Sequence, residues 1–131
     1  MLTLDDARRV IAAAEKMAEE IDCPMDIAVV DGGGNLKAHV RMDGAFIGSI
    51  DVSINKAYTA VAFQTETKEL ALLAQSGQEL FGLSDAAGGR IVVFAGGIPL
   101  RQDGEIVGAV GVSTGTVDQD QQVAEAGAAA F

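Results

Sequence analysis

The sequence is short of several residue types, and each shortage excludes a class of protein. Its 131 residues include one cysteine, Cys23, which excludes an internal disulfide and a metal site built from several cysteines. His39 is the only histidine, and no cysteine or carboxylate stands at ligand spacing from it, so we predict no mononuclear metal site. No apolar run reaches the roughly 18 residues that a membrane-spanning helix needs.

Positive charge is also scarce, with 9 Lys and Arg residues against 19 Asp and Glu residues and a formal net charge of -10. Such an acidic surface repels phosphate backbones and anionic lipids, so we expect neither nucleic acid nor a membrane as partner. The N-terminus lacks the basic and apolar regions of a signal peptide. We therefore expect a cytoplasmic protein.

What is present suits one globular domain over residues 1–131, because 49% of the residues are hydrophobic. The first segment repeats apolar residues at three- and four-residue spacing over residues 4–21, which predicts a helix with Thr3 as its N-cap. The next two segments, residues 27–30 and 36–42, flank the turn sequence DGGGN and predict a hairpin.

The remaining chain predicts helices over residues 49–63, near 65–75 and after Thr116, which has the capping-box spacing to Gln119. In the first of these helices, we expect Ile50, Ile54, Ala57 and Val61 to face the core. Residues 91–114 predict two or three strands with a hairpin turn at QDGE. Because short turns join the strands, we predict an α+β fold with an antiparallel sheet.

The stretch RMDGA, residues 41–45, follows a strand whose side chains alternate. Leu36, Ala38, Val40 and Met42 lie on one face, and Lys37, His39 and Arg41 lie on the other. A second feature is the sequence FAGGIP, in which two glycines interrupt an apolar strand. Glycines weaken a strand and add no side chain to the core. Gly96 and Gly97 therefore mark either a bulge or a place where a ligand lies against bare backbone.

Several of these pieces together resemble the GlcG/HbpS family, which is related to the C-terminal domain of PduO-type proteins. The matching stretches are IAVVDGGGNL, RMDGA, NKAYTAVAF, GGIPL, DGEIVGAVGVS and DQDQQVAEAG. The resemblance covers essentially the whole chain in the same order. It implies a profilin-like antiparallel sheet with helices packed against it, and homo-oligomers that include octamers. Some members bind haem, which makes haem the implied cofactor.

The resemblance also implies a shared pocket rim. Its ligand-binding residues would be Arg41, Asp43, Asn55, Lys56, Gly96, Gly97 and Pro99. Gly44 and Asp120 also match the family's motifs and would belong to the same rim. If haem binds, the candidate iron ligands are His39 and Met42.

Three functions remain open from the sequence. The first is a small-molecule-binding protein whose ligand is haem or another anionic compound held by Arg41 and Lys56. The second is an enzyme, or an enzyme accessory, acting on a small hydroxy acid, aldehyde or diol, with Lys56 or Asp43 as the acid–base group. The third is a structural oligomer without a ligand site, in which Arg41 pairs with Asp43.

Overall fold

The computed structural model of the chain describes all 131 residues. The elements in chain order are α1 (Leu4–Glu20), β1 (Asp26–Asp31), β2 (Leu36–Arg41), α2 (Ser49–Phe63), α3 (Thr67–Leu73), the 3-10 turns η1 (Leu83–Asp85) and η2 (Ala87–Gly89), β3 (Gly97–Gln102), β4 (Glu105–Ser113) and α4 (Val117–Ala129). This confirms the predicted α+β class. None of these helices is both long and apolar enough to cross a membrane.

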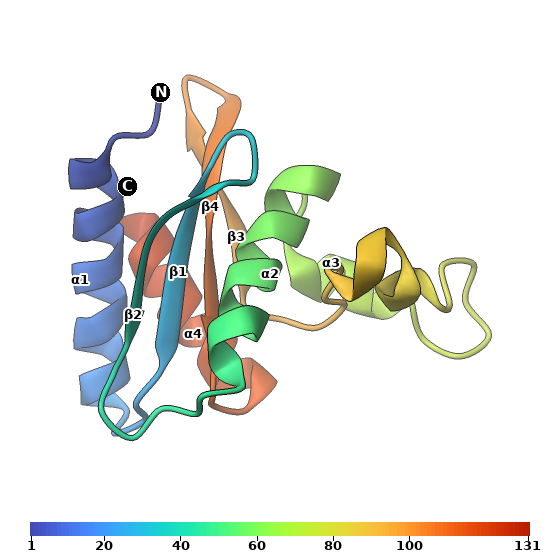
Figure 1. Cartoon of the computed structure of the whole chain (residues 1–131), viewed down its shortest axis with the longest axis horizontal. Coiled ribbons are helices and arrows are strands. Elements are labelled where there is room, and N and C mark those ends of the chain that lie inside the picture. The colour runs from blue at the N-terminus through green and yellow to red at the C-terminus, as the bar shows by residue number, and fades with distance from the viewer.

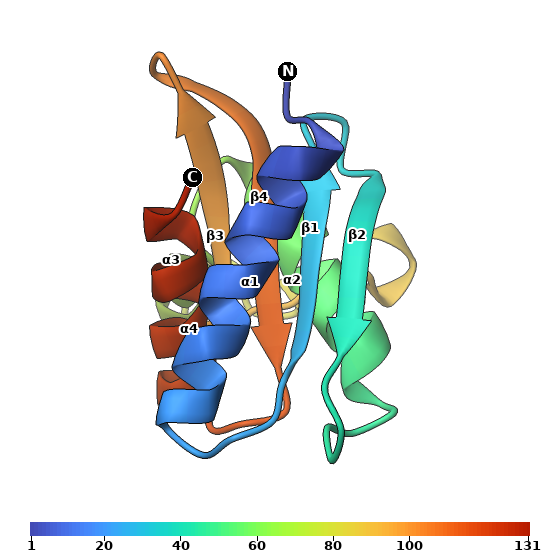
Figure 2. The same ribbon diagram turned by 90° about the vertical axis from the view of Figure 1, so that its left-hand side faces the viewer.

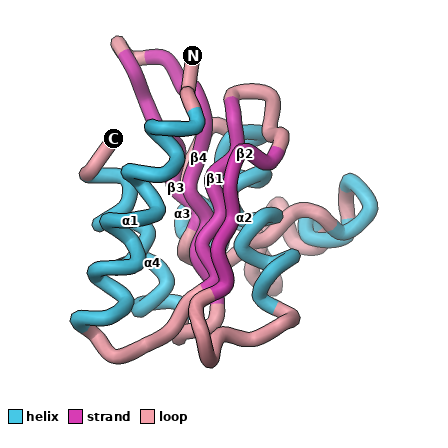
Figure 3. Tube along the Cα trace, turned by 60° about the vertical axis from the view of Figure 1, so that its left-hand side comes forward, coloured by secondary structure: helices cyan, strands magenta, loops and turns pink.

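The four strands form one antiparallel sheet in the order β2-β1-β4-β3, which places β2 and β3 at its edges. Helices α1 and α4 pack side by side on one face, and α2 covers the other (Figure 1). Figure 2 looks onto the face that carries α1 and α4, and Figure 3 shows the sheet between the two helical layers. The segment between α3 and β3 extends away from the sheet.

Local hydrogen bonds explain why the elements begin and turn where the sequence predicts. Thr3 and Asp6 form a capping box at the start of α1, and Thr116 and Gln119 form the predicted one at α4. In the β1–β2 turn, the Asp31 carboxylate accepts hydrogen bonds from two backbone amides of the DGGGN loop. The β3–β4 turn has positive φ angles at both central residues, as a two-residue hairpin with an Asp-Gly turn requires.

One predicted strand is shorter than expected. Residues 91–96 lie outside the sheet, and β3 begins only at Gly97. Pro99 pairs with Ala109 in β3, and this strand lies at an edge, where a residue without an N–H group is tolerated. The predicted break near FAGGIP is therefore confirmed, and it leaves two strands in this part of the chain.

The inward face of α2 differs from the predicted one. Ala57 is buried, but Ile50, Ile54 and Val61 are only partly buried. The side chains that are fully enclosed under α2 are instead mainly small or polar: Ser49, Ser53, Lys56, Ala57, Thr59 and Ala60. The reason lies in β4, where a Cβ atom on Gly111 would collide with the α2 backbone at Ser53 and Ala57. Such close packing leaves no room for large apolar side chains beneath the helix.

The hydrophobic core is correspondingly unequal on the two faces of the sheet. The larger cluster lies between the sheet and the α1–α4 layer and includes Val10, Ile27, Val110 and Val123. The smaller one, beneath α2, consists of Val30, Ala57, Ala60 and Ala109. Much of the α2 face is therefore filled by polar side chains, and each of them needs a hydrogen-bonding partner.

Candidate functional site

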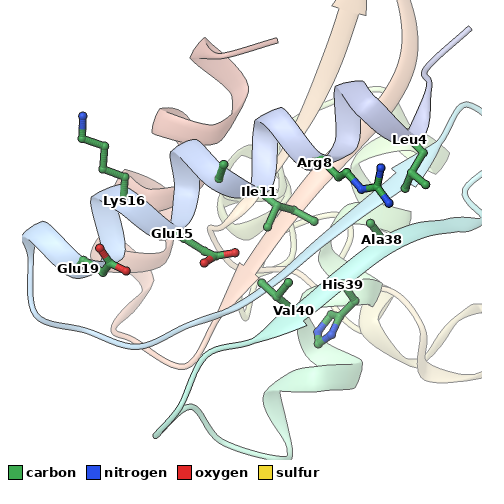
Figure 4. A pocket seen from close by; sticks show the side chains of 10 residues that line it. Leu4, Arg8, Ile11, Glu15, Lys16, Glu19, Ala38, His39 and Val40 are labelled. Atoms are coloured by element: carbon green, nitrogen blue, oxygen red, sulfur yellow. The ribbon is translucent and has the colours of Figure 1, made fainter.

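An open groove of about 560 Å³ runs between α1 and the edge strand β2. We call it the α1–β2 groove. Its apolar lining comes from Leu4, Ile11, Ala12, Ala38 and Val40, its charged lining comes from Arg8, Glu15, Lys16 and Glu19, and His39 completes it. Figure 4 shows Arg8 near Leu4 and Ala38, with Glu15 and Glu19 farther along the helix. Arg8 makes only an exposed ion pair with Asp5 at 3.5 Å, which binds it weakly.

A second groove of about 420 Å³ adjoins the first, because both are lined by Glu15, Glu19 and Val40. The other residues that line it are Arg41, Met42 and Asp43. The structure therefore brings together the first three residues of the RMDGA stretch. The predicted pairing of Arg41 with Asp43 is absent, and the Arg41 guanidinium instead donates a long hydrogen bond of 3.5 Å to the Ala45 carbonyl.

His39 contributes to the lining of the α1–β2 groove, although its side chain points to the opposite face of β2. Its register partner in β1 is Ala28, and both residues face α2. Figure 4 shows the imidazole pointing away from α1. The ring Nε2 lies 3.2 Å from the Ser53 hydroxyl and 3.7 Å from Oδ1 of Asp26. Of the two candidate iron ligands, His39 thus lines the α1–β2 groove with its ring turned toward α2, whereas Met42 lines the adjoining groove.

Asp26 is the centre of a polar cluster between the sheet and the start of α2. One carboxylate oxygen, Oδ2, accepts a hydrogen bond of 3.0 Å from Thr114, which has the unusual φ of 118°. The other oxygen, Oδ1, is buried and has no hydrogen-bonding partner. Burial raises the pKa of Asp26, against the opposing effects of Thr114, His39 and Arg41. Burial also lowers the pKa of His39, and the nearby Asp26 opposes this shift.

Lys56 forms a second polar centre beneath α2. Its Nζ atom is fully enclosed and donates hydrogen bonds of 2.8 Å to Oδ2 of Asp120 and to the Val112 carbonyl. The Phe94 ring lies over the ammonium at 4.9 Å. Burial lowers the pKa of Lys56 and raises that of Asp120, and each charge opposes the shift of the other. Lys56 thus links α2 to α4 and β4.

The two glycines of FAGGIP lie against this pair. A Cβ atom on Gly96 would lie 2.7 Å from the Val112 carbonyl oxygen and 2.8 Å from Nζ of Lys56. On Gly97 it would lie 2.7 Å from the Thr67 side chain. The Gly96 amide also donates to Gln121, and the Gly97 amide donates to Thr67. In this conformation, the space beside both glycines is occupied by atoms of the chain itself.

The predicted rim residues are therefore divided among several places. Arg41 and Asp43 line one groove, whereas Lys56, Gly96, Gly97 and Asp120 meet beneath α2. Asn55 is partly buried in α2, where its carbonyl accepts a hydrogen bond from Thr59. Pro99 lines a separate, smaller groove of about 230 Å³ with Arg101 and residues around the end of α2.

Sequence reasoning missed the α1 side of the groove and the role of Asp26. The sequence pattern of the outward face of α1 is that of an ordinary solvated helix face. The groove exists only because β2 lies beside this face in the folded chain. Asp26 is the first residue of the strongly apolar strand β1, and a carboxylate at the start of such a run was the signal that could have singled it out.

Comparisons with known proteins agree with this fold over the whole chain. Residues 2–129 match the family model described as haem degrading protein HbpS-like. An uncharacterized 15.0 kDa protein from the dhaT-dhaS intergenic region of Citrobacter freundii is 46% identical over 124 residues, covering 95% of this chain and 87% of that protein.

Two further relatives connect the chain to PduO. The corrinoid adenosyltransferase PduO of Citrobacter freundii is 37% identical over 130 residues, and the alignment covers 99% of this chain but only 39% of PduO. The crystal structure of a PduOC:heme complex superposes with a TM-score of 0.95 at 35% identity and covers 99% of this chain and 94% of that one. Together with the family match, these similarities show that the chain belongs to the GlcG/HbpS family.

Proposed function

We propose that this chain is a small-molecule-binding protein whose ligand, haem or a similar anionic apolar compound, lies in the α1–β2 groove. The observation that carries the proposal is the groove itself. Its volume of about 560 Å³ falls in the range of known ligand sites, roughly 300–1,000 Å³. The haem complex of the related PduOC supports haem as the first ligand to test.

The lining of the groove fits the chemistry of haem. Ile11, Ala12 and Val40 offer apolar surface to a macrocycle, and Arg8 offers a planar donor to a carboxylate. Met42, beside the adjoining groove, is the thioether that would serve as the iron ligand. Bound haem would supply a redox-active iron, and the role of this chain would be to hold and orient it. Arg41 would add a second cation at the Met42 end.

The proposal is tested by haem titration of the chain without an affinity tag, followed at the Soret band. We expect saturation near one haem per chain in the wild type. Ala12→Phe fills the groove from the exposed side of α1 and should weaken binding at least tenfold. Ala62→Phe adds the same ring at an exposed position of α2, across the sheet, and should bind like the wild type. Equal binding by both variants would contradict the proposed location.

Two charge and ligand variants refine this test. Arg8→Glu should weaken haem binding, whereas Arg101→Glu on the exposed end of β3 serves as its charge-matched control. Met42→Ala should change the position of the Soret band, and His39→Ala should leave it unchanged. A spectrum altered only by His39→Ala would place the iron on the α2 face and contradict our assignment.

A binding function is preferred over turnover because of where the proposed acid–base group lies. Lys56 has 0% exposure and is held by Asp120 and Val112, so a substrate has no access to it in this conformation. Asp43 is exposed and lines the groove of Arg41 and Met42, but no ion pair or hydrogen bond of its side chain fixes it in place for acid–base work. The binding roles of Asn55, Lys56, Gly96, Gly97 and Pro99 stay predictions.

We further propose that the chain forms a cytoplasmic homo-oligomer. The support is an apolar surface at the start of α2, where Phe46 is 64% exposed and Ile47 is 74% exposed. Partly exposed Ile50 and Ile54 extend it along the helix. Neighbouring large apolar side chains of this kind usually mark a contact surface.

A further inference from the structure

The unpartnered oxygen of Asp26 requires an explanation that the proposed haem groove does not give. Asp26 has 0% exposure, and its Oδ1 atom receives no hydrogen bond from any group of the chain. A buried acceptor without a donor costs about 1–3 kcal/mol, and more when it is charged. An unsatisfied buried group in a native fold calls for an explanation, and a bound ion that completes it is one.

The atoms around Oδ1 indicate what that partner would be. His39 Nε2 lies 3.7 Å from Oδ1 and 3.2 Å from the Ser53 hydroxyl oxygen. The Ser53 hydroxyl donates its proton to the Ile50 carbonyl at 2.9 Å, so its lone pairs remain for another partner. The imidazole nitrogen thus lies within 3.7 Å of both a carboxylate oxygen and a hydroxyl oxygen. The carboxylate and the imidazole are common ligands for a divalent metal of the zinc class, and a neutral hydroxyl is a weaker oxygen ligand.

We propose that Asp26, His39 and Ser53 form a binding site for one divalent transition-metal ion such as Zn²⁺ or Co²⁺. In a tetrahedral zinc site with bonds of about 2.0–2.2 Å, neighbouring ligand atoms lie about 3.3–3.6 Å apart. The two separations from His39 Nε2, 3.2 Å to Ser53 and 3.7 Å to Asp26, lie on either side of this range. Small rotations of the three side chains would therefore close the site.

The access and the ligand count define the kind of site. The His39 side chain is 15% exposed, which gives an ion a path from solvent that Asp26 lacks. No group of three His, Cys, Asp or Glu side chains is arranged for a metal in this chain. The site therefore has two strong ligands, with the Ser53 hydroxyl as a third and water as a fourth. This is the composition of an open site rather than a closed structural one.

The site meets the haem groove only through His39, which lines the groove while its ring points toward α2. It lies on the α2 face of the sheet, whereas the groove lies on the α1 face, so either proposal can fail alone. Arg41 brings a positive charge to the site, because it acts on the Asp26 carboxylate and pairs in register with Asp26 across β1 and β2. Its positive charge should repel a metal ion. Removing that charge should therefore strengthen metal binding, a result that a merely structural role for Arg41 would not produce.

The test is calorimetric titration of the untagged chain with Zn²⁺ and, for visible spectra, with Co²⁺. Since His39 is the only histidine, a histidine-dependent signal reports this site alone. We expect one metal per chain, with binding weakened about tenfold or more by His39→Gln and by Asp26→Asn. Arg41→Gln should bind more tightly than the wild type. Circular dichroism should show that each variant is folded.

Matched controls separate this site from other metal ligands. Cys23→Ser removes the only thiol, and Asp22→Asn removes an exposed carboxylate; both should leave the affinity unchanged. The proposal is overturned if the wild type takes up no metal at one equivalent, if His39→Gln binds as well as the wild type, or if Cys23→Ser abolishes binding. The wild-type result decides even if a variant fails to fold.

Discussion

Oδ1 of Asp26 lies 3.7 Å from Nε2 of His39 and has no hydrogen bond from either this imidazole or any other group. The two residues lie on neighbouring strands and face α2, beneath a helix whose inward surface is largely polar. This relationship has a consequence for stability. A buried carboxylate with one oxygen that lacks a donor destabilises the fold when it is ionised.

Asp26→Asn should therefore stabilise the protein at neutral pH, by about 1–3 kcal/mol. Burial raises the pKa of Asp26 in the folded state above its ordinary value of 3.8. Its contribution to stability is then fully present below pH 3.8 and is lost as the pH rises through the raised folded pKa. The extra stability of Asp26→Asn over the wild type should therefore grow as the pH rises over the same range. Urea unfolding across pH with a chelator present measures it, and a pH-independent difference would contradict this account.

Lys56 and Asp120 should depend on each other. Lys56→Met leaves the Asp120 carboxylate buried without its cation and should destabilise the protein by about 3–5 kcal/mol. Adding Asp120→Leu removes the unpaired charge, so the double variant should regain much of the loss. Urea denaturation of the wild type, both single variants and the double variant forms a complete cycle. Purely additive losses would show that the two side chains are not coupled.

Gly96→Ala distinguishes the two interpretations of the FAGGIP stretch. Gly96 has a φ of 121°, and an added Cβ atom would press on the Val112 carbonyl and on Lys56. If the glycine is needed for the backbone conformation, strain in the variant should lower the free energy of unfolding by at least about 1–3 kcal/mol. If the glycine instead serves a ligand, thermal unfolding without ligand should be close to that of the wild type, and only binding should change.

The apolar surface at the start of α2 should set the oligomeric state. Ile47→Glu adds a charge where the side chain is exposed, so it should leave the monomer fold intact and reduce the assembly size. Light scattering coupled to gel filtration measures the mass directly. Leu4→Glu is a control, since Leu4 is an exposed leucine on α1, across the sheet. An unchanged mass for Ile47→Glu would place the contact surface elsewhere.

The local features of the fold were predictable from the sequence, because they depend on neighbouring residues. The stripe of α1, the two hairpin turns and the capping box at Thr116 all follow from short-range spacing. The inward face of α2 was not predictable in this way. Ser53, Lys56 and Thr59 are buried because a glycine-rich strand and the Asp120 carboxylate receive them, and these partners lie far away in the chain.

The candidate site was only partly predictable for the same reason. RMDGA placed Arg41, Met42 and Asp43 together, and alternation correctly separated Met42 from His39. The α1–β2 groove, however, joins residues from a helix and a strand whose pairing no local pattern reveals. The missing partner of Asp26 is likewise a property of the folded arrangement and cannot be read from the residues around it.

Hydrogen–deuterium exchange with and without haem tests the central claim most directly, because it locates the ligand on the chain. The account predicts slower exchange in peptides that cover residues 4–20 and 36–43, which line the two grooves. Peptides within residues 49–63 of α2 should exchange as before. Protection of α2 without protection of α1 would contradict the proposed site.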